Sequence, residues 1–199
     1  MTKGEETKFK IIQAAIKIFN SEGINWTSFK MLADKVGISQ PALYKYFADK
    51  DALLLECCLE VVKRGQKFID DQIDVNSPAR QRLAAYVEGN IRWAMEKSKE
   101  ADLVVAMYSH GSFSNAFKNL HHLIDQGGMK RIETHLIHIS FEKGITGSSP
   151  EETIDKVQLI HSLLSGEVLK ALRWPGKLSA GARTEKIMQF IDGILNDRR

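Results

Sequence analysis

The chain has 199 residues, of which 43% are hydrophobic and 27% charged, a balance typical of globular proteins with one or two domains. No apolar run is long enough to span a membrane and no secretory signal precedes a small-residue cleavage site, so a membrane or exported protein is not predicted. The net charge of +3 belongs to residues 1–50, because residues 51–199 are neutral. This placement indicates a basic surface near the N-terminus.

Residues 7–21 are expected to form an amphipathic helix that ends at Gly23. Ile24 and Trp26 are then expected to fill a small core between this helix and the next two. The apolar stripe of the helix at residues 7–21 contains Phe9, Ile12, Ala15, Ile16 and Phe19.

Residues 27–47 have the pattern of a helix-turn-helix. Thr27 is predicted to cap a short helix that ends at Gly37, and Ser39 to cap a second helix with Pro41 in its first turn. Two short helices joined by a Gly-containing turn are the unit that places a reading helix in the DNA major groove. The apolar face of the first helix consists of Phe29, Leu32, Ala33 and Val36.

The second helix of this unit is predicted to turn Leu43 and Phe47 inward and to expose polar and aromatic groups. Gln can pair with an adenine edge, small apolar groups can contact a thymine methyl, and Tyr and Lys suit phosphates. A solvated turn in a helical protein is the alternative. The outward residues are Gln40, Pro41, Ala42, Tyr44, Lys45 and Tyr46.

The first quarter of the chain resembles the DNA-binding domain of the TetR family of bacterial transcriptional regulators. Lys30-Met31 and Asp49 depart from the usual pattern, although Asp49 can still cap a helix. The matching residues are Ile11–Phe19, Glu22-Gly23, Thr27-Ser28, Leu32-Ala33, Val36–Ser39, Leu43–Phe47, Lys50 and Leu53-Leu54. The residues predicted to contact DNA are Thr27, Ser28, Lys30, Ser39, Gln40, Pro41, Ala42, Tyr44, Lys45, Tyr46 and Lys50.

The rest of the chain predicts further helices, so the expected fold is all-α with about nine helices. A fourth helix is expected from Asp49 to about Asp71, and Asn76-Ser77-Pro78 provides a cap and a first-turn proline for a fifth. Gly127-Gly128 marks either a kink or a loop. The remaining helices are predicted at about 101–108, 114–142, 150–173 and from Ser179 to the end. The predicted domains are 1–50, for DNA binding, and 51–199, for regulation and dimerisation.

The middle helices are rich in large, adaptable apolar groups with a few polar ones, a mixture that suits a small-molecule pocket. Ordinary core packing is the alternative for each residue. The predicted ligand-binding residues are Asn90, Trp93, Met107, Tyr108, His110, Phe113, Phe117 and Met129.

The last two helices suit a four-helix interface with a second subunit. Internal packing explains their apolar faces equally well, and the resemblance to the TetR family favours the homodimer. The predicted interface residues are Val157, His161, Leu164, Val168, Phe190 and Ile194.

Metal and enzyme functions have weaker support. His135, His138 and Glu142 share a helix face and could hold Zn²⁺, but solvated or core histidines are the simpler interpretation, and no metal or cofactor is expected. No phosphate-binding glycine motif, nucleophile elbow or predicted strand supports catalysis, so the protein is not expected to be an enzyme.

The resemblance therefore implies a cytoplasmic homodimer that binds double-stranded DNA. We expect a repressor that a small molecule releases from a near-palindromic operator. The alternatives are the same fold regulated by a protein partner or without a ligand, and, less favoured, a metal sensor or a helical enzyme.

Overall fold

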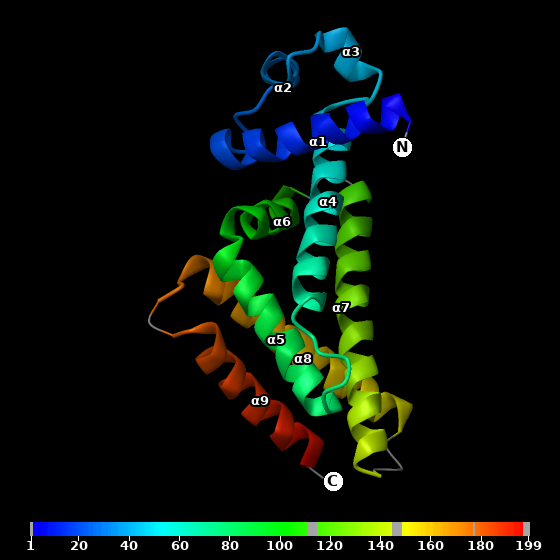
Figure 1. Ribbon diagram of the computed structural model, residues 1–199, viewed down its shortest axis with the longest axis vertical. Helices are drawn as coiled ribbons and strands as arrows, with labels where there is room; N and C mark the ends of the chain where they lie inside the picture. Colours follow the sequence, from blue (N-terminus) through cyan, green and yellow to red (C-terminus); the bar gives the residue numbers. More distant parts are fainter. Residues whose placement is uncertain (1, 111–114, 145–148, 177, 197–199) are drawn as a thin grey trace. The chain divides into compact units, whose positions relative to one another are not determined.

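The computed structural model describes residues 2–110, 115–144, 149–176 and 178–196, which form nine α-helices and no β-strand (Figure 1). This confirms the all-α prediction. Among the described helices, none is both long and apolar enough to cross a membrane. The helices are α1 (Lys3–Glu22), α2 (Phe29–Val36), α3 (Gln40–Tyr44), α4 (Lys50–Asp70), α5 (Ala79–Glu96), α6 (Ser98–His110), α7 (Asn115–Glu142), α8 (Pro150–Arg173) and α9 (Ala180–Asn196).

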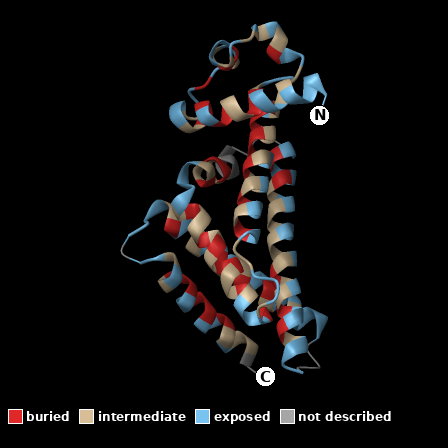
Figure 2. Cartoon of the chain, in the orientation of Figure 1, coloured by how far each residue is buried: buried red, intermediate tan, exposed pale blue. Residues whose placement is uncertain are grey.

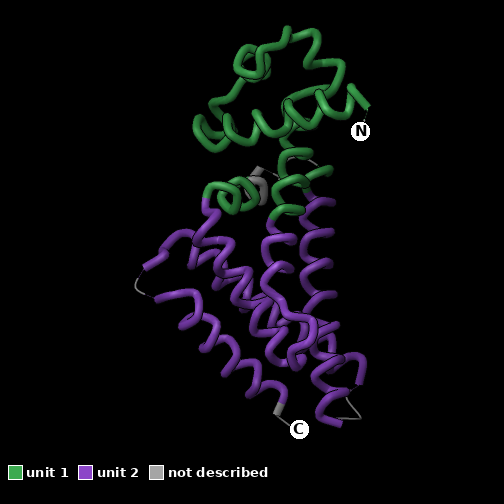
Figure 3. Tube along the Cα trace, viewed as in Figure 1, with its two compact units in different colours: residues 1–64, 99–117 green, residues 65–98, 118–199 purple. Residues whose placement is uncertain are grey.

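The chain divides into two compact units (Figure 3). Unit 1 comprises residues 1–64 and 99–117, and unit 2 comprises residues 65–98 and 118–199. One boundary falls inside α4, between Arg64 and Gly65, so a single continuous helix contributes to both units. The functional division predicted at residue 50 stays a prediction.

The N-terminal helix α1 begins earlier than predicted because its first turn is capped. The Thr2 hydroxyl accepts a hydrogen bond from the Glu5 amide, and the Glu5 carboxylate accepts one from the Thr2 amide. This reciprocal pair satisfies two amides that otherwise lack a partner in the helix. The buried face of α1, which packs against α2, contains Ile11, Ile12, Ala15, Ile16, Ile18 and Phe19.

The start of α2 differs from the prediction by one residue. Ser28 is the cap, because its Oγ accepts a hydrogen bond from the Met31 amide at 3.0 Å. Thr27 is buried and donates its hydroxyl to the Gly23 carbonyl at 2.7 Å, so its assignment as the cap was wrong. The helix ends, as predicted, at Gly37, which has the left-handed φ of 79°.

Trp26 does not belong to the core of unit 1. Its side chain is 86% exposed, and only the edge of its ring approaches Gly23. The inward position in this turn is taken by Thr27, which its hydrogen bond to Gly23 holds against the end of α1. The aromatic type of residue 26 predicted burial, whereas the turn geometry decided which neighbour faces inward.

A polar network within unit 1 joins three of its helices. Arg64 on α4 donates to Glu60 at 3.0 Å, to Glu100 of α6 at 3.2 Å and to Gln13 of α1. Gln13 also donates to Glu60 at 3.3 Å. Because one guanidinium serves all three helices, it fixes how α1, α4 and α6 approach one another.

The helix α5 is central to unit 2. It packs against α8 and α9, and Figure 2 shows buried residues along its length. Toward α4 its Trp93 ring lies so close to Gly65 that a Cβ there would stand 2.9 Å from the ring. Ile69 likewise packs closely against Gly89, so a larger residue at position 89 would have little space.

The start of α5 is capped by a distant side chain. Both carboxylate oxygens of Glu142 accept from the Ala79 amide, at 3.0 and 2.9 Å, whereas Pro78 at the cap position makes no side-chain bond. The local cap predicted at Asn76-Ser77 was therefore wrong, and the Ser77 hydroxyl donates instead to the Asp74 carbonyl. A cap 63 residues away in the sequence leaves no local signal.

The helices α7 and α8 lie within one residue of their predicted bounds, and α9 begins directly after its predicted cap, whereas α6 is longer at both ends than the predicted 101–108. The helix α7 continues through Gly127-Gly128 without a loop. Ser149 accepts from the Glu152 amide at the start of α8, and Ser179 from the Ala182 amide at the start of α9, which confirms both predicted caps.

Candidate nucleic-acid interface

The short helix α3 presents the predicted reading residues. Ser39 caps it by accepting from the Ala42 amide at 3.3 Å, and Pro41 stands in its first turn. Leu43 and Phe47 are buried, as predicted, and hold α3 against the core of unit 1. The remaining side chains of α3 therefore face away from this core.

The predicted reading residues differ in exposure. Pro41, Tyr44 and Lys45 are exposed, whereas Gln40, Ala42 and Tyr46 are half-buried. The Tyr44 ring meets Phe29 of α2 edge-on, with the centroids 4.8 Å apart. This contact orients Tyr44 and fixes α3 relative to α2.

The lysines of this region fall into two groups. Lys30 and Lys45 are exposed, and neither makes a hydrogen bond or ion pair within the described part of the chain. Lys35 instead pairs with Glu22 at 2.6 Å, and Lys50 donates to the Ile24 carbonyl at 3.1 Å. Lys30 and Lys45 are thus the predicted contact residues whose ammonium groups are available to a phosphate.

The predicted hydroxyl contacts all have structural roles. Thr27 is buried, whereas Ser28 and Ser39 are exposed and cap α2 and α3. A capping Oγ accepts a hydrogen bond from the backbone, so its own O–H remains able to donate to a phosphate oxygen.

Lys8 was not predicted to take part in this region. Its ammonium pairs with Glu56 of α4 at 2.6 Å and lies 5.6 Å from the centroid of the Phe47 ring, so α1 is tied to the residues that follow α3. Lys8 and Glu56 are 48 residues apart, so no regular spacing in the sequence predicts that they pair. The exposed Trp26, just before α2, was also assigned to the core and not to this surface.

The predicted ligand-binding residues divide between the two units. Phe117 is buried in unit 1, while Asn90, Trp93 and Met129 belong to unit 2. Phe113 and the side chains of Met107, Tyr108 and His110 lie outside the described residues.

Two of the unit 2 candidates have defined surroundings. Asn90 donates its side-chain amide to the Tyr86 carbonyl at 2.8 Å. Trp93 packs on Gly65, and its buried Nε1 has no hydrogen-bond partner among the described groups. An unpaired buried donor costs free energy, which makes Trp93 a candidate for binding an acceptor.

The histidines of α7 do not form a metal site in the described ranges, where no three His, Cys, Asp or Glu side chains gather suitably. Glu142 is bound to the Ala79 amide, and the Nδ1 atom of His138 lies 3.4 Å from Arg82. Burial, and then the positive charges of Arg131, Arg82 and His138, lower the pKa of His135 to about 4. Burial also raises the pKa of Cys58 to about 12, so this free thiol stays protonated.

The predicted interface residues of α8 and α9 occupy both sides of these helices. Val157 and Leu164 are buried within unit 2, His161, Val168 and Ile194 are half-buried, and Phe190 is 46% exposed. Other apolar groups on the same two helices are exposed, namely Ile154, Leu159 and Leu169.

The capped α2–turn–α3 unit, supported by α1, defines a helix-turn-helix protein. Residues 11–57 match the family model described as bacterial regulatory proteins, tetR family. The N-terminal part of the chain is therefore similar to the DNA-binding region of the TetR family.

Curated relatives match over part of the chain. The HTH-type transcriptional regulator BetI of Vibrio atlanticus (strain LGP32) is 23% identical over 65% of this chain and 64% of its own length. The tetracycline repressor protein class D of Escherichia coli is 39% identical over 29% of this chain and 27% of its own. The matches thus span less than two thirds of these relatives.

Solved structures share the fold along nearly the whole chain. A transcriptional regulator from Pseudomonas aeruginosa PAO1 has a TM-score of 0.84 at 19% identity and covers 98% of this chain and 93% of its own. A TetR transcription regulator from Haloarcula marismortui ATCC 43049 has a TM-score of 0.77 at 16% identity, covering 96% and 97%.

Proposed function

We propose that the protein is a DNA-binding transcriptional regulator, a repressor that a small molecule releases from its operator. The observation that carries this proposal is the α2–α3 unit, in which Gln40, Tyr44 and Lys45 face outward from a capped, glycine-turned scaffold. Lys45 and Lys30 supply phosphate contacts and Gln40 supplies base recognition. Such a protein acts in the cytoplasm, where bacterial DNA lies.

The proposed regulator acts as a homodimer through α8 and α9. A two-fold symmetric dimer presents two copies of α3 to half-sites about one helical turn apart, so its operator is near-palindromic. The exposed apolar groups on α8 and α9, including Phe190 and Leu169, support this arrangement.

The proposed effector binds unit 2 and acts through α4, which belongs to both units. A ligand changes DNA affinity only through its different affinity for the two states, typically worth about 1–3 kcal/mol. Trp93 Nε1 and His135 Nδ1 have no hydrogen-bond partner among the described residues, which favours a ligand over the alternative of a fully packed, ligand-free regulator.

The test is selection of genomic fragments by the purified protein at about physiological salt, followed by sequencing. The proposal expects enrichment of one near-palindromic sequence, with a specific affinity about 10³-fold or more above that for random DNA. Retention of fragments without any shared sequence would overturn it.

A further inference from the structure

A cluster of polar side chains lies at the edge of the apolar interior of unit 2. Tyr86 of α5 is buried and contacts two half-buried residues of α7 that are one helical turn apart. The Arg131 guanidinium carbon lies 5.0 Å from the centroid of the Tyr86 ring, and the centroid of the His135 ring lies 5.6 Å from it. Arg131 and His135 therefore share one face of α7, and both contact the Tyr86 ring.

The cluster has hydrogen-bonding capacity to spare. His135 Nδ1 is buried, and no described group lies within hydrogen-bonding distance of it. Arg131 uses Nη2 to bind Asp70, and its Nε and Nη1 make no hydrogen bond to the described residues. The free N–H groups of this guanidinium can bind one oxygen of a carboxylate, and the neighbouring imidazole can bind the other.

The charges nearest His135 are positive. Arg131 and His138 flank it on α7 and Arg82 approaches from α5, and all three disfavour its protonation. The nearby acids are already engaged, Asp70 by Arg131 and Glu142 by the Ala79 amide. His161 of α8 approaches the same stretch of α7 at Gly128, where a Cβ would stand 2.8 Å from its Nε2. An anion at His135 would therefore be next to three cationic or imidazole side chains, while the carboxylate of Asp70 stays bound to Arg131.

Three residues of α5 extend from this cluster along one face of the helix. Tyr86, Asn90 and Trp93 recur at helical spacing on one face, and about 10 Å of helix separates the first from the last. Trp93 packs its ring on Gly65 of α4. Large apolar surface of this kind suits the body of a hydrophobic ligand.

We propose that unit 2 binds a monocarboxylate with an apolar tail, whose carboxylate lies between Arg131 and His135 and whose tail follows α5 toward Trp93. This inference rests on the proposed function, because it gives the effector of the regulator a chemical class. An amine is disfavoured by the two guanidinium groups, and a neutral alcohol leaves the Arg131 donors without a charged acceptor.

Binding is linked to protonation of His135. A carboxylate beside the ring favours its charged form and raises its pKa from about 4, so the complex takes up protons as it forms. The affinity for the carboxylate therefore increases as the pH falls from 8 to 6.

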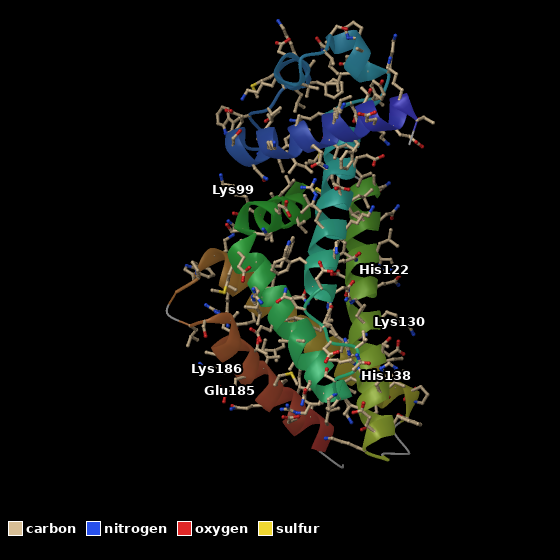
Figure 4. All side chains as sticks on the ribbon, viewed as in Figure 1. Lys99, His122, Lys130, His138, Glu185 and Lys186 are labelled. Carbon is tan, nitrogen blue, oxygen red and sulfur yellow. The ribbon has the colours of Figure 1, made fainter. Side chains whose placement is uncertain are left out.

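The test is isothermal titration calorimetry of the full-length, DNA-free protein with octanoate at pH 6 and pH 8. We expect octanoate to bind at least about tenfold more tightly than 1-octanol, and more tightly at pH 6 than at pH 8. Arg131→Gln and His135→Phe are each expected to weaken octanoate binding about tenfold or more, whereas the control His122→Gln leaves it unchanged. His122 lies on the same helix, where it is exposed (Figure 4).

A second readout does not depend on the folding of a variant. In the wild-type protein, NMR titration of the His135 ring protons is expected to show a higher pKa with octanoate than without it. Equal binding of octanoate and 1-octanol, no octanoate binding, or an unchanged His135 pKa would overturn the inference. If octanoate binds as expected while no specific DNA is retained, the carboxylate site stands and the proposed regulatory function fails.

Discussion

At the scale of single residues, the fold depends on side chains that each bind one particular backbone group. Thr27 and Ser28 are adjacent hydroxyl residues, yet one is buried on the Gly23 carbonyl and the other caps α2. Glu142 caps a helix that begins 63 residues before it. Each of these bonds satisfies a backbone group that would otherwise be unpaired, so each side chain has a defined place.

His135 makes stability depend on pH. Its pKa is about 4 in the folded protein, below the ordinary 6.5, so between these values the unfolded chain binds more protons and stability falls as the pH falls. At pH 5 the expected loss relative to pH 7 is about 1 kcal/mol from this residue, because solvent screening of the partly exposed ring reduces the full effect of the shift.

This loss is measured by urea unfolding of the wild type and of His135→Phe at pH 5 and pH 7. The phenylalanine keeps the ring volume and does not titrate, so the difference in stability between the two pH values should shrink by about 1 kcal/mol. An identical pH dependence in both proteins would show that His135 titrates normally in the folded state.

At the scale of helices, α7 shows why paired glycines do not mean a loop. Gly128 faces His161, and its lack of a side chain allows that imidazole to approach the helix backbone. Gly127 faces open space, where a Cβ would meet nothing within 4 Å. Only one of the two glycines therefore has a packing reason in unit 2.

Gly127→Ala should raise the free energy of unfolding by about 0.5–1 kcal/mol, because alanine favours the helix and meets no neighbour. Gly128→Ala should be about 1 kcal/mol or more less stable than Gly127→Ala, since its Cβ must displace His161. Urea unfolding compares the matched pair. Equal gains for both substitutions would mean that the contact between Gly128 and His161 is unimportant.

The exposed face of α8 and α9 has a direct test in the predicted dimer. Phe190→Glu places a charge within the proposed interface and should convert the dimer to a monomer in sedimentation equilibrium. The matched control is Phe141→Glu on α7, where the side chain is 86% exposed outside the proposed interface. A wild-type monomer, or a dimer unaffected by Phe190→Glu, would contradict the arrangement.

At the scale of the whole molecule, local signals predicted what local interactions determine. The caps at Ser39, Ser149 and Ser179 and the end of α2 at Gly37 follow from residues within one turn, and all four are confirmed. Trp26 and the cap of α5 were predicted wrongly because burial and distant partners decide them. The polar cluster around Tyr86 also joins residues about 45 positions apart, which no sequence spacing encodes.

The central claim, that α3 reads DNA, is tested most directly by a salt titration of binding to the selected operator. We expect Lys45→Ala to weaken binding to all sequences and to make the salt dependence shallower by about one counterion. Gln40→Ala should reduce the preference for the operator over random DNA by about 1–3 kcal/mol, and Lys186→Ala on α9 should change neither quantity. Operator binding that is unchanged in both Lys45→Ala and Gln40→Ala would contradict the account.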